Sequence, residues 1–374
     1  MAIAKATGGT ITYDGNYVIH TFLSSGTFST TSAFNVETIV VAGGGGGGYA
    51  GSRGAGGGGG GGLIYDSSHA VTAQAYPITV GDGGAGGISD IPTDGRRGAD
   101  GANSVFDDKT ADGGGGGGEF TTDGRDGGSG GGGAGGENGG TGTGGTATAT
   151  QGYDGGDGYA TSSVAAAGGG GGGAGAVGTN GVSTQGGNGG VGLDYSTEFG
   201  TSVGVSGWFA GGGAGDSGAG NSGTGGTGGG AADGAAGTAN TGGGGGGNGT
   251  SIAPGAGGSG IVIIKYLTAV TNMTLVSEST EAEANPDNIR MFIVEKDTDA
   301  ITLGTDYKGY CSRDAGANWV EATLTDEGDI EDSGRIFTGV ADVSGQASDK
   351  TIKWKIETLN NKDCDTRAVG LLWD

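Results

Sequence analysis

Unbroken runs of glycine constrain the fold of this chain more than any other feature. Five runs of at least six glycines occupy residues 43–48, 56–62, 113–118, 168–173 and 242–247. Glycine loses more backbone entropy on folding than any other residue, so such runs become ordered only where their N–H and C=O groups find partners. The runs therefore leave two alternatives, a flexible linker or a structure held together by backbone hydrogen bonds.

The glycines divide the chain into two regions. Of 101 glycines in 374 residues, only 8 lie in residues 261–374. We therefore expect a glycine-rich domain over residues 1–266 and a separate C-terminal module over residues 267–374. Both regions are acidic, and the formal net charge is −24. Because such a surface repels phosphate, no nucleic-acid partner is expected.

The two ends of the glycine-rich domain are typical of β-strands, since they are rich in β-branched and aromatic residues. Strands at residues 10–42, 76–80 and 259–266 predict a small β-sandwich base. For the block 43–258 we favour packed polyglycine-II helices, which have three residues per turn and no internal hydrogen bonds. Leu, Ile, Val and Phe make up about 16% of the chain, a composition otherwise typical of disorder. Backbone hydrogen bonding between helices would supply the missing cohesion.

The opening and the closing of this region resemble a known family. Tyr17, His20, Phe22 and the run Ser25–Phe28, then Val36–Ala42 leading into glycine, are similar to the glycine-rich domain of bacteriophage tail-fibre and receptor-binding proteins. The closing strand Gly258–Tyr266 fits the same pattern, so the resemblance covers about residues 10–266. It implies polyglycine-II helices whose distal loops bind host receptors.

The C-terminal module is predicted to be a β-sandwich with little or no α-helix. Its apolar residues alternate, as in Thr351–Thr358, where Ile352, Trp354 and Ile356 share one face. Several of its segments also resemble a module found at the ends of phage structural proteins. These segments are Asn272–Val276, Ser312–Gly316, Trp319, Asp342–Gln346, Lys353–Asn361 and Leu371–Asp374. Cys311 and Cys364 are interpreted as free thiols, with pairing left open.

Catalytic and metal-binding patterns are not found in the sequence. The chain has two histidines and two cysteines, too few for a zinc cluster or for a Ser-His-Asp constellation. Neighbouring acids such as Asp107 and Asp108 are interpreted as solubilising surface charges. We therefore expect no enzyme activity, no cofactor and no metal site. The longest bulky apolar run, Ile261–Ile264, is far too short to span a membrane.

Two groups of residues are singled out. Ser312, Asp314, Gly316 and Trp319 match S-x-D-x-G-x-x-W, the turn motif of sialidase-like propellers, and are predicted to shape a structural turn. Tyr195, Phe199, Trp208 and Phe209 cluster in a short aromatic segment between glycine runs. Because Tyr and Trp are enriched at recognition surfaces, these four are candidate receptor-binding residues. The alternative is that they cap the helix ends against water.

These features predict a phage virion protein, either a tail fibre or a fibre-tip adhesin that recognises a host surface. The expected partners are other virion proteins and a host receptor, a glycan or an outer-membrane protein, and a homotrimer is plausible. The protein would be made in the host cytoplasm and carried on the tail or the capsid exterior. A head fibre or capsid decoration protein is the alternative, and an ice-binding protein is a more distant one.

Overall fold

The computed structural model describes residues 4–374 except 52, 89–96, 137–138, 163–164, 219–220, 251–252, 269–271, 298–299, 331–333, 348, 361 and 363. The chain divides into two compact units, Ala2–Thr268 and Ala269–Asp374. Both are built almost wholly of strands and extended segments, and the one described helix, α1 (Ser196–Phe199), has a single turn. The prediction of a mostly β fold is confirmed. No described helix is long and apolar enough to cross a membrane.

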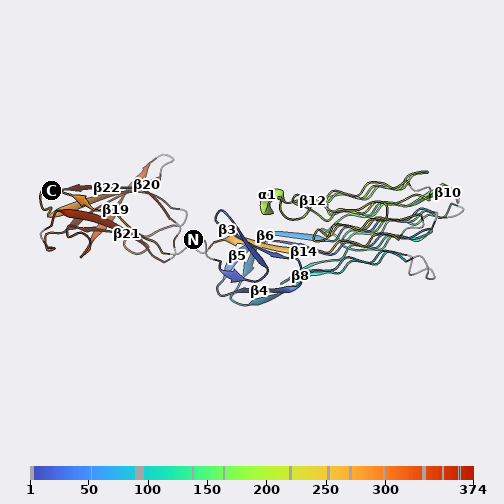
Figure 1. Cartoon of the computed structure of the whole chain (residues 1–374), viewed down its shortest axis with the longest axis horizontal. Helices are drawn as coiled ribbons and strands as arrows, with labels where there is room; N and C mark the ends of the chain where they lie inside the picture. The colour runs from blue at the N-terminus through green and yellow to red at the C-terminus, as the bar shows by residue number, and fades with distance from the viewer. Residues whose placement is uncertain are drawn as a thin grey trace. The chain divides into compact units, whose positions relative to one another are not determined.

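The first unit begins with two five-stranded antiparallel sheets that share one core (Figure 1). One sheet has the order β2 (Thr10–Asp14), β3 (Tyr17–Phe22), β14 (Ile261–Leu267), β5 (Phe34–Val41) and β6 (Leu63–Val71). The other has the order β1 (Ala6–Thr7), β4 (Gly26–Thr30), β7 (Ala75–Thr79), β8 (Ser104–Phe106) and β9 (Lys109–Ala111). The expected strands are present, and the β8–β9 hairpin adds a pair inside the glycine-rich block.

The core between these sheets is aromatic and aliphatic. Phe28 and Phe106 are fully buried, and their rings meet edge to face with centroids 6.0 Å apart. His20 lies in the same layer, where Nε2 is 2.8 Å from the hydroxyl of Tyr266 and Nδ1 is 2.7 Å from the carbonyl oxygen of Gly8. Burial lowers the pKa of His20, so the ring is neutral at pH 7 and acts as a packed structural residue.

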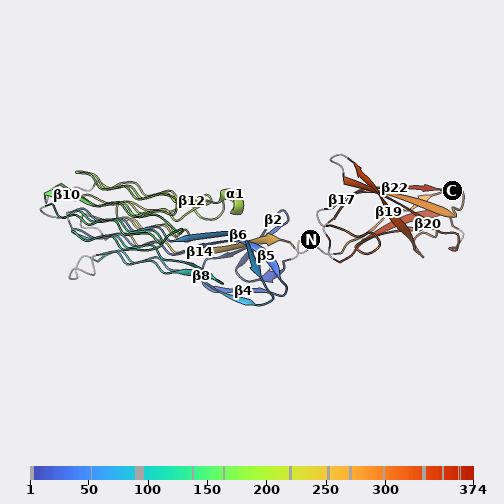
Figure 2. The ribbon, with the colours of Figure 1, turned by 180° about the vertical axis from the view of Figure 1, so that it is seen from behind.

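The glycine-rich segments run side by side along the unit, alternately away from the sheets and back (Figures 1 and 2). The run 43–48 shows how they are joined. Its N–H groups donate hydrogen bonds of 2.8–3.0 Å (N···O) to three neighbouring segments in turn, 99–102, 255–258 and 56–59. Every third residue of the run donates to the same segment. Its carbonyls accept in the same rotation from segments 84–87, 114–117 and 245–248. This threefold pattern is that of packed polyglycine-II helices.

Six neighbours around one helix leave no room for a side chain. A Cβ added at any residue of 43–48 would lie 2.0–2.2 Å from a neighbouring carbonyl oxygen. The runs 56–62 and 168–173 are enclosed in the same way. An outer helix needs glycine only on its inner side: residues 98–103 read Gly-Ala-Asp-Gly-Ala-Asn, with glycine at every third position. Unbroken glycine therefore marks the interior of the block.

Acidic and amide side chains satisfy N–H groups at the edges of the block. Asp100 and Asn103 accept hydrogen bonds from the N–H groups of Gly116 and Gly113, at 2.9 and 2.8 Å. The same three-residue spacing recurs twice: Asp123 and Asp126 accept from Thr143 and Thr146, and Asp157 and Asp154 accept from Gly144 and Ala147. From the sequence alone, acidic residues of this kind are interpreted as solubilising charges. In the structure they accept hydrogen bonds from N–H groups at the edges of the block, much as edge strands of a sheet are protected by charged side chains.

Asp126→Ala should lower the free energy of unfolding of the first unit by about 1 kcal/mol, because it removes the acceptor of the Thr146 N–H, 2.6 Å away. Asp126→Asn keeps an acceptor oxygen of the same shape and should retain most of the stability. Thermal unfolding of the two variants beside the unaltered chain measures the difference. Equal stability of all three proteins would show that solvent replaces the carboxylate at no cost.

The second unit forms one antiparallel half-barrel from two connected layers. One layer contains β15 (Thr274–Val276), β16 (Thr280–Glu281), β21 (Thr351–Thr358) and β18 (Tyr307–Ser312), and the other contains β20 (Gly334–Asp342), β17 (Asn288–Asp297) and β22 (Cys364–Trp373). Strand β19 (Val320–Ile330) joins them, because its first three residues pair with β18 and its later residues pair with β20. The sandwich expected from the sequence is thus continuous through one long strand.

The core of the second unit lies between these layers. Met291 and Ile293 from one layer meet Tyr307 and Ile356 from the other, and all four are fully buried. Cys311 is buried on β18 and Cys364 lies on β22, and neither cysteine forms a disulfide, as the sequence favours. Burial raises the pKa of the Cys311 thiol to about 12, so it packs as a small apolar group.

Candidate recognition surfaces

The aromatic segment forms a hairpin at the end of the block next to the sheets. Strand β12 (Leu193–Asp194) pairs with β13 (Trp208–Phe209), and α1 lies between them. In Figure 1, α1 and β12 lie at the end of the block near β6 and β14, and β10 (Tyr159–Ser162) marks the opposite, distal end. The four predicted receptor-binding residues are therefore proximal, and they do not belong to the distal loops.

Three of these four aromatics pack on the outer face of the β2–β3–β14–β5–β6 sheet, whereas Trp208 precedes the buried Phe209 on β13 and so points to the opposite side. Phe209 is fully buried and Phe199 is 4% exposed, in one cluster with Ile39 and Ile263 of the sheet. The Tyr195 ring lies 4.9 Å, centroid to centroid, from the ring of Tyr65 on β6. Tyr195 and Trp208 are half-buried. The structure thus brings Tyr195, Phe199 and Phe209 together as a cover over the sheet and leaves Trp208 outside this cluster.

A buried charge fastens this cover to the sheet. The Lys265 ammonium lies 2.8 Å from the Glu37 carboxylate and donates to the Glu198 carbonyl in α1. The hydroxyl of Tyr65 donates to Glu37 at 2.7 Å, and burial together with this carboxylate raises the pKa of Tyr65. These contacts hold α1 against the sheet.

A groove of about 390 Å³ runs beside this cover. Threonine hydroxyls from β2 and β3 form one wall, and loop residues next to α1 form the other. Its lining includes Thr10, Thr12, Thr21, Leu23, Phe199, Val203 and Asn240. Phe199 alone of the predicted receptor-binding residues contributes to it. Alternating Thr10 and Thr12 on an edge strand was a sequence signal for this wall.

The distal end of the block carries a different set of side chains. The Arg53 guanidinium lies over the Phe120 ring, 4.8 Å from its centroid, and Val182 is 56% exposed at the turn 182–185. The buried Asp216 carboxylate joins two distal loops, since it accepts from the N–H groups of Ser217 at 2.8 Å and Gly249 at 2.7 Å. Burial raises the pKa of Asp216 against these hydrogen bonds. These two distal loops are therefore fastened to each other through Asp216.

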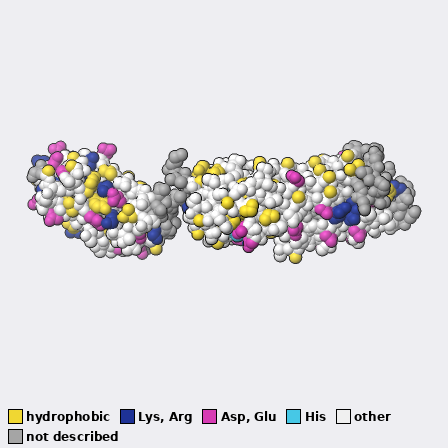
Figure 3. Space-filling model, turned by 90° about the horizontal axis from the view of Figure 1, so that it is seen from below, with side chains coloured by type: hydrophobic (Ala, Val, Ile, Leu, Met, Phe, Trp, Pro, Cys, Tyr) yellow, Lys and Arg dark blue, Asp and Glu magenta, His cyan; other side chains and the backbone are white. Residues whose placement is uncertain are grey.

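Backbone and small polar side chains make up much of one face of the helix block. Figure 3 shows the face seen there as mostly backbone and small polar groups, with scattered charges. Because inner positions exclude any Cβ, bulky side chains are confined to the helix ends and outer edges. Chemical variety is accordingly concentrated in the loops at the two ends.

A small group of ligand-type atoms lies near the β8–β9 hairpin. His69, Asp107 and Asp108 each offer one atom within 4.8 Å of the others. His69 Nε2 is 2.9 Å from Asp107, and the Lys109 ammonium is 3.1 Å from Asp108 and 3.2 Å from Asp66. Lys109 thus supplies the positive charge that a metal ion would bring, and the group is an ion-pair network.

The predicted turn in the second unit has the geometry of a hydrogen-bonded hairpin cap. The Ser312 hydroxyl lies 2.7 Å from Asp314 Oδ1 and accepts from the Gly316 N–H at 3.0 Å. Asp314 also accepts from the N–H of Asn318 at 2.9 Å. Burial raises the pKa of Asp314, but these hydrogen bonds outweigh it and hold the pKa below its ordinary value. Gly316 has φ +85°, and Trp319 packs beside it.

Sequence reasoning missed Arg313, the central residue of this turn. Its guanidinium is 5% exposed and donates to the carbonyl oxygens of Pro286, Ser344 and Gln346 at 2.8, 2.6 and 2.8 Å. A further bond reaches Asp287 at 3.1 Å. The S-x-D-x-G-x-x-W pattern did not indicate a role for Arg313, because the pattern allows any residue at that position.

Comparison with known families supports the reading of the first unit. A model of the family described as glycine-rich domain matches residues 23–267. This match covers more than half of the chain and coincides with the sandwich base and the helix block, so the chain belongs to the glycine-rich domain family. A search of curated proteins found no match.

Proposed function

We propose that this chain is a fibre protein of a bacteriophage virion, in a tail fibre or at a fibre tip, and that it recognises the host surface. One observation carries the proposal: a lattice of backbone hydrogen bonds holds separate loops at the distal end of the block, away from the sheets. Loops on a rigid scaffold can vary without disturbing a core. The resemblance of Tyr17–Phe28 and Gly258–Tyr266 to phage receptor-binding proteins supports the same assignment.

The distal loops are the favoured contact with a host glycan or outer-membrane protein. The proximal aromatic hairpin is less suited to that task, because Phe199 and Phe209 are buried against the sheet. The second unit, with its own closed core, suits attachment to other virion proteins. This assignment puts the protein on the exterior of the tail.

Binding of labelled proteins to candidate host cells tests the proposal. The full chain and residues 2–268 should bind, and residues 269–374 should not. Val182→Glu, at a distal turn, should weaken binding about tenfold, whereas Val191→Glu should not. Both valines are exposed, 56% and 43%, and Val191 lies near the proximal end, so the pair is matched. Binding by residues 269–374 alone would assign recognition to the second unit.

Absence of binding by every protein would overturn the receptor proposal in favour of a capsid decoration protein. The number of copies per virion separates these roles. A tail fibre is expected in a few copies, whereas a decoration protein follows the symmetry of the head.

A further inference from the structure

Strand β22 is the long free edge of the second unit. Among the described strands it pairs with β17 alone, so no described strand lies along its other side. Proteins protect such edges with bulges, charges or proline. The first half of β22 has these devices, namely Asp365, Arg367 and a bulge where the register with β17 shifts. The second half, residues 368–373, has none of them.

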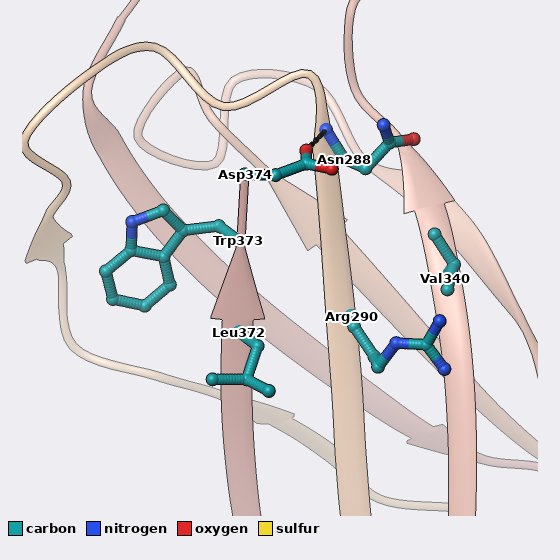
Figure 4. A pocket seen from close by; sticks show the side chains of 6 residues that line it. All are labelled: Asn288, Arg290, Val340, Leu372, Trp373 and Asp374. Carbon is teal, nitrogen blue, oxygen red and sulfur yellow. Dashed lines mark hydrogen bonds between the residues drawn. The ribbon is translucent and has the colours of Figure 1, made fainter.

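The face beside this unprotected half is exposed and apolar. Leu372 is 61% exposed, Trp373 is 41% exposed, and Val340 on β20 is 41% exposed. A shallow depression of about 360 Å³ lies between them, with Arg290 of β17 in its middle (Figure 4). Leu372 and Val340 flank Arg290 in register. In Figure 4, Trp373 lies on the side of β22 away from β17.

The sequence of this edge is complementary to itself. In an antiparallel pairing of two β22 strands about Gly370, Val369 stands opposite Leu371, and Ala368 stands opposite Leu372. The bulge at Arg367 interrupts this register, so Arg367 lies near Trp373 and Asp374 of the partner without one fixed opposite residue, and each end of the contact offers a cation to an aromatic ring and a carboxylate. Residues directly opposite in an antiparallel pair share one face of the sheet, so the apolar outer residues of the two copies become neighbours.

We propose that β22 is a homodimerisation edge, at which a second copy of this chain adds its own β22 antiparallel across a two-fold axis at Gly370. The pairing adds a strand along the outer side of β22 in both copies, in the manner of β-strand addition. It also joins the two apolar outer faces into one. The charge pattern favours a second copy over an unrelated strand: Arg367 donates from Nε to Asp365 of its own chain at 3.2 Å, and an identical partner adds the Asp374 carboxylate beside the same guanidinium at both ends of the contact. The inference does not depend on the proposed host recognition.

Gly370 permits a direct test, because a Cβ there would meet nothing within 4 Å in the single chain. In the dimer, a residue at the two-fold axis faces its own copy, so Gly370→Lys and Gly370→Glu each place like charges opposite one another. Sedimentation of the full chain should give a concentration-dependent dimer. Each variant alone should raise the dimer dissociation constant at least about tenfold, and an equimolar mixture of the two should restore the dimer.

Gly345→Lys is the matched control, because Gly345 also has open space around its Cβ position and lies in a loop outside β22. It should dimerise as the unaltered chain does, and circular dichroism should show the same fold for all variants. A monomer at every concentration would overturn the proposal. So would a trimer, or dimerisation that neither charge variant weakens, or a mixture that fails to recover.

Discussion

Replacing Gly58 by alanine is expected to destabilise the first unit by more than about 4 kcal/mol, a loss that single substitutions reach only exceptionally. The new Cβ would lie 2.1 Å from the carbonyl oxygen of Gly45 and 2.6 Å from its carbonyl carbon. The backbone cannot move aside, because the Gly58 N–H donates to Gly245 at 2.9 Å and its carbonyl accepts from Gly213 at 2.8 Å. A methyl group therefore breaks hydrogen bonds in several helices at once.

Gly26→Ala is the matched control in the same unit. Its Cβ would meet the Phe22 ring at 3.5 Å, an ordinary van der Waals contact, and its φ is not positive. We expect its stability within about 1 kcal/mol of the unaltered chain. Calorimetry of the full chain gives the measurement, with the unfolding of the second unit as an internal reference. If Gly58→Ala and Gly26→Ala melted alike, the close-packed lattice would be refuted.

This sensitivity follows from what holds the block together. In an ordinary core an added methyl group displaces side chains, which relax at a cost of about 1–3 kcal/mol. Here the neighbours of each inner residue are peptide groups that also carry the hydrogen bonds. The peptide groups that a new methyl group would strike are the same groups that form the hydrogen bonds between helices. Moving them to relieve the clash therefore breaks these hydrogen bonds. The block is ordered despite a composition typical of disorder because its stability does not come from apolar burial.

The inner part of the block was predictable from the sequence, and its edges were not. A run such as 168–173 indicates a helix enclosed on all sides, because any side chain would be excluded. The role of Asp100 or Asp126 could not be inferred, since their partners Gly116 and Thr146 are 16 and 20 residues away. The strands of the second unit were evident from alternation, whereas the bend of β19 between layers depends on contacts with β18 and β20 that alternation does not encode.

The position of the aromatic hairpin could be predicted from the sequence only in part. The exclusion of side chains from inner helices already requires that Tyr195, Phe199, Trp208 and Phe209 lie at an end of the block. Which end depends on how many times the chain has crossed the block before residue 193. Several crossings, such as 124–128, are short and carry side chains, so they cannot be counted from glycine runs. The structure resolves that count and places the hairpin beside the sheets.

Arg313→Met is expected to lower the free energy of unfolding of the second unit by about 3 kcal/mol. The guanidinium fastens the β18–β19 turn to two other loops through the carbonyl oxygens of Pro286, Ser344 and Gln346. Methionine fills much of the volume but leaves the buried carbonyl of Pro286 without its donor, at about 1–3 kcal/mol, and removes the two partly buried bonds to Ser344 and Gln346. Arg313→Lys should recover less than half of the loss, because an ammonium lacks the planar fork that reaches separate acceptors.

Lys350→Met separates this effect from the loss of a surface charge. The Lys350 ammonium is exposed and makes a contact of the same kind, a 2.7 Å hydrogen bond to the carbonyl oxygen of Glu283. Its replacement should change stability by about 0.5 kcal/mol or less. Denaturant unfolding of residues 269–374 measures both variants. Equal effects would mean that the loops around Arg313 hold their positions without it, and that the turn motif of Ser312 and Asp314 is sufficient by itself.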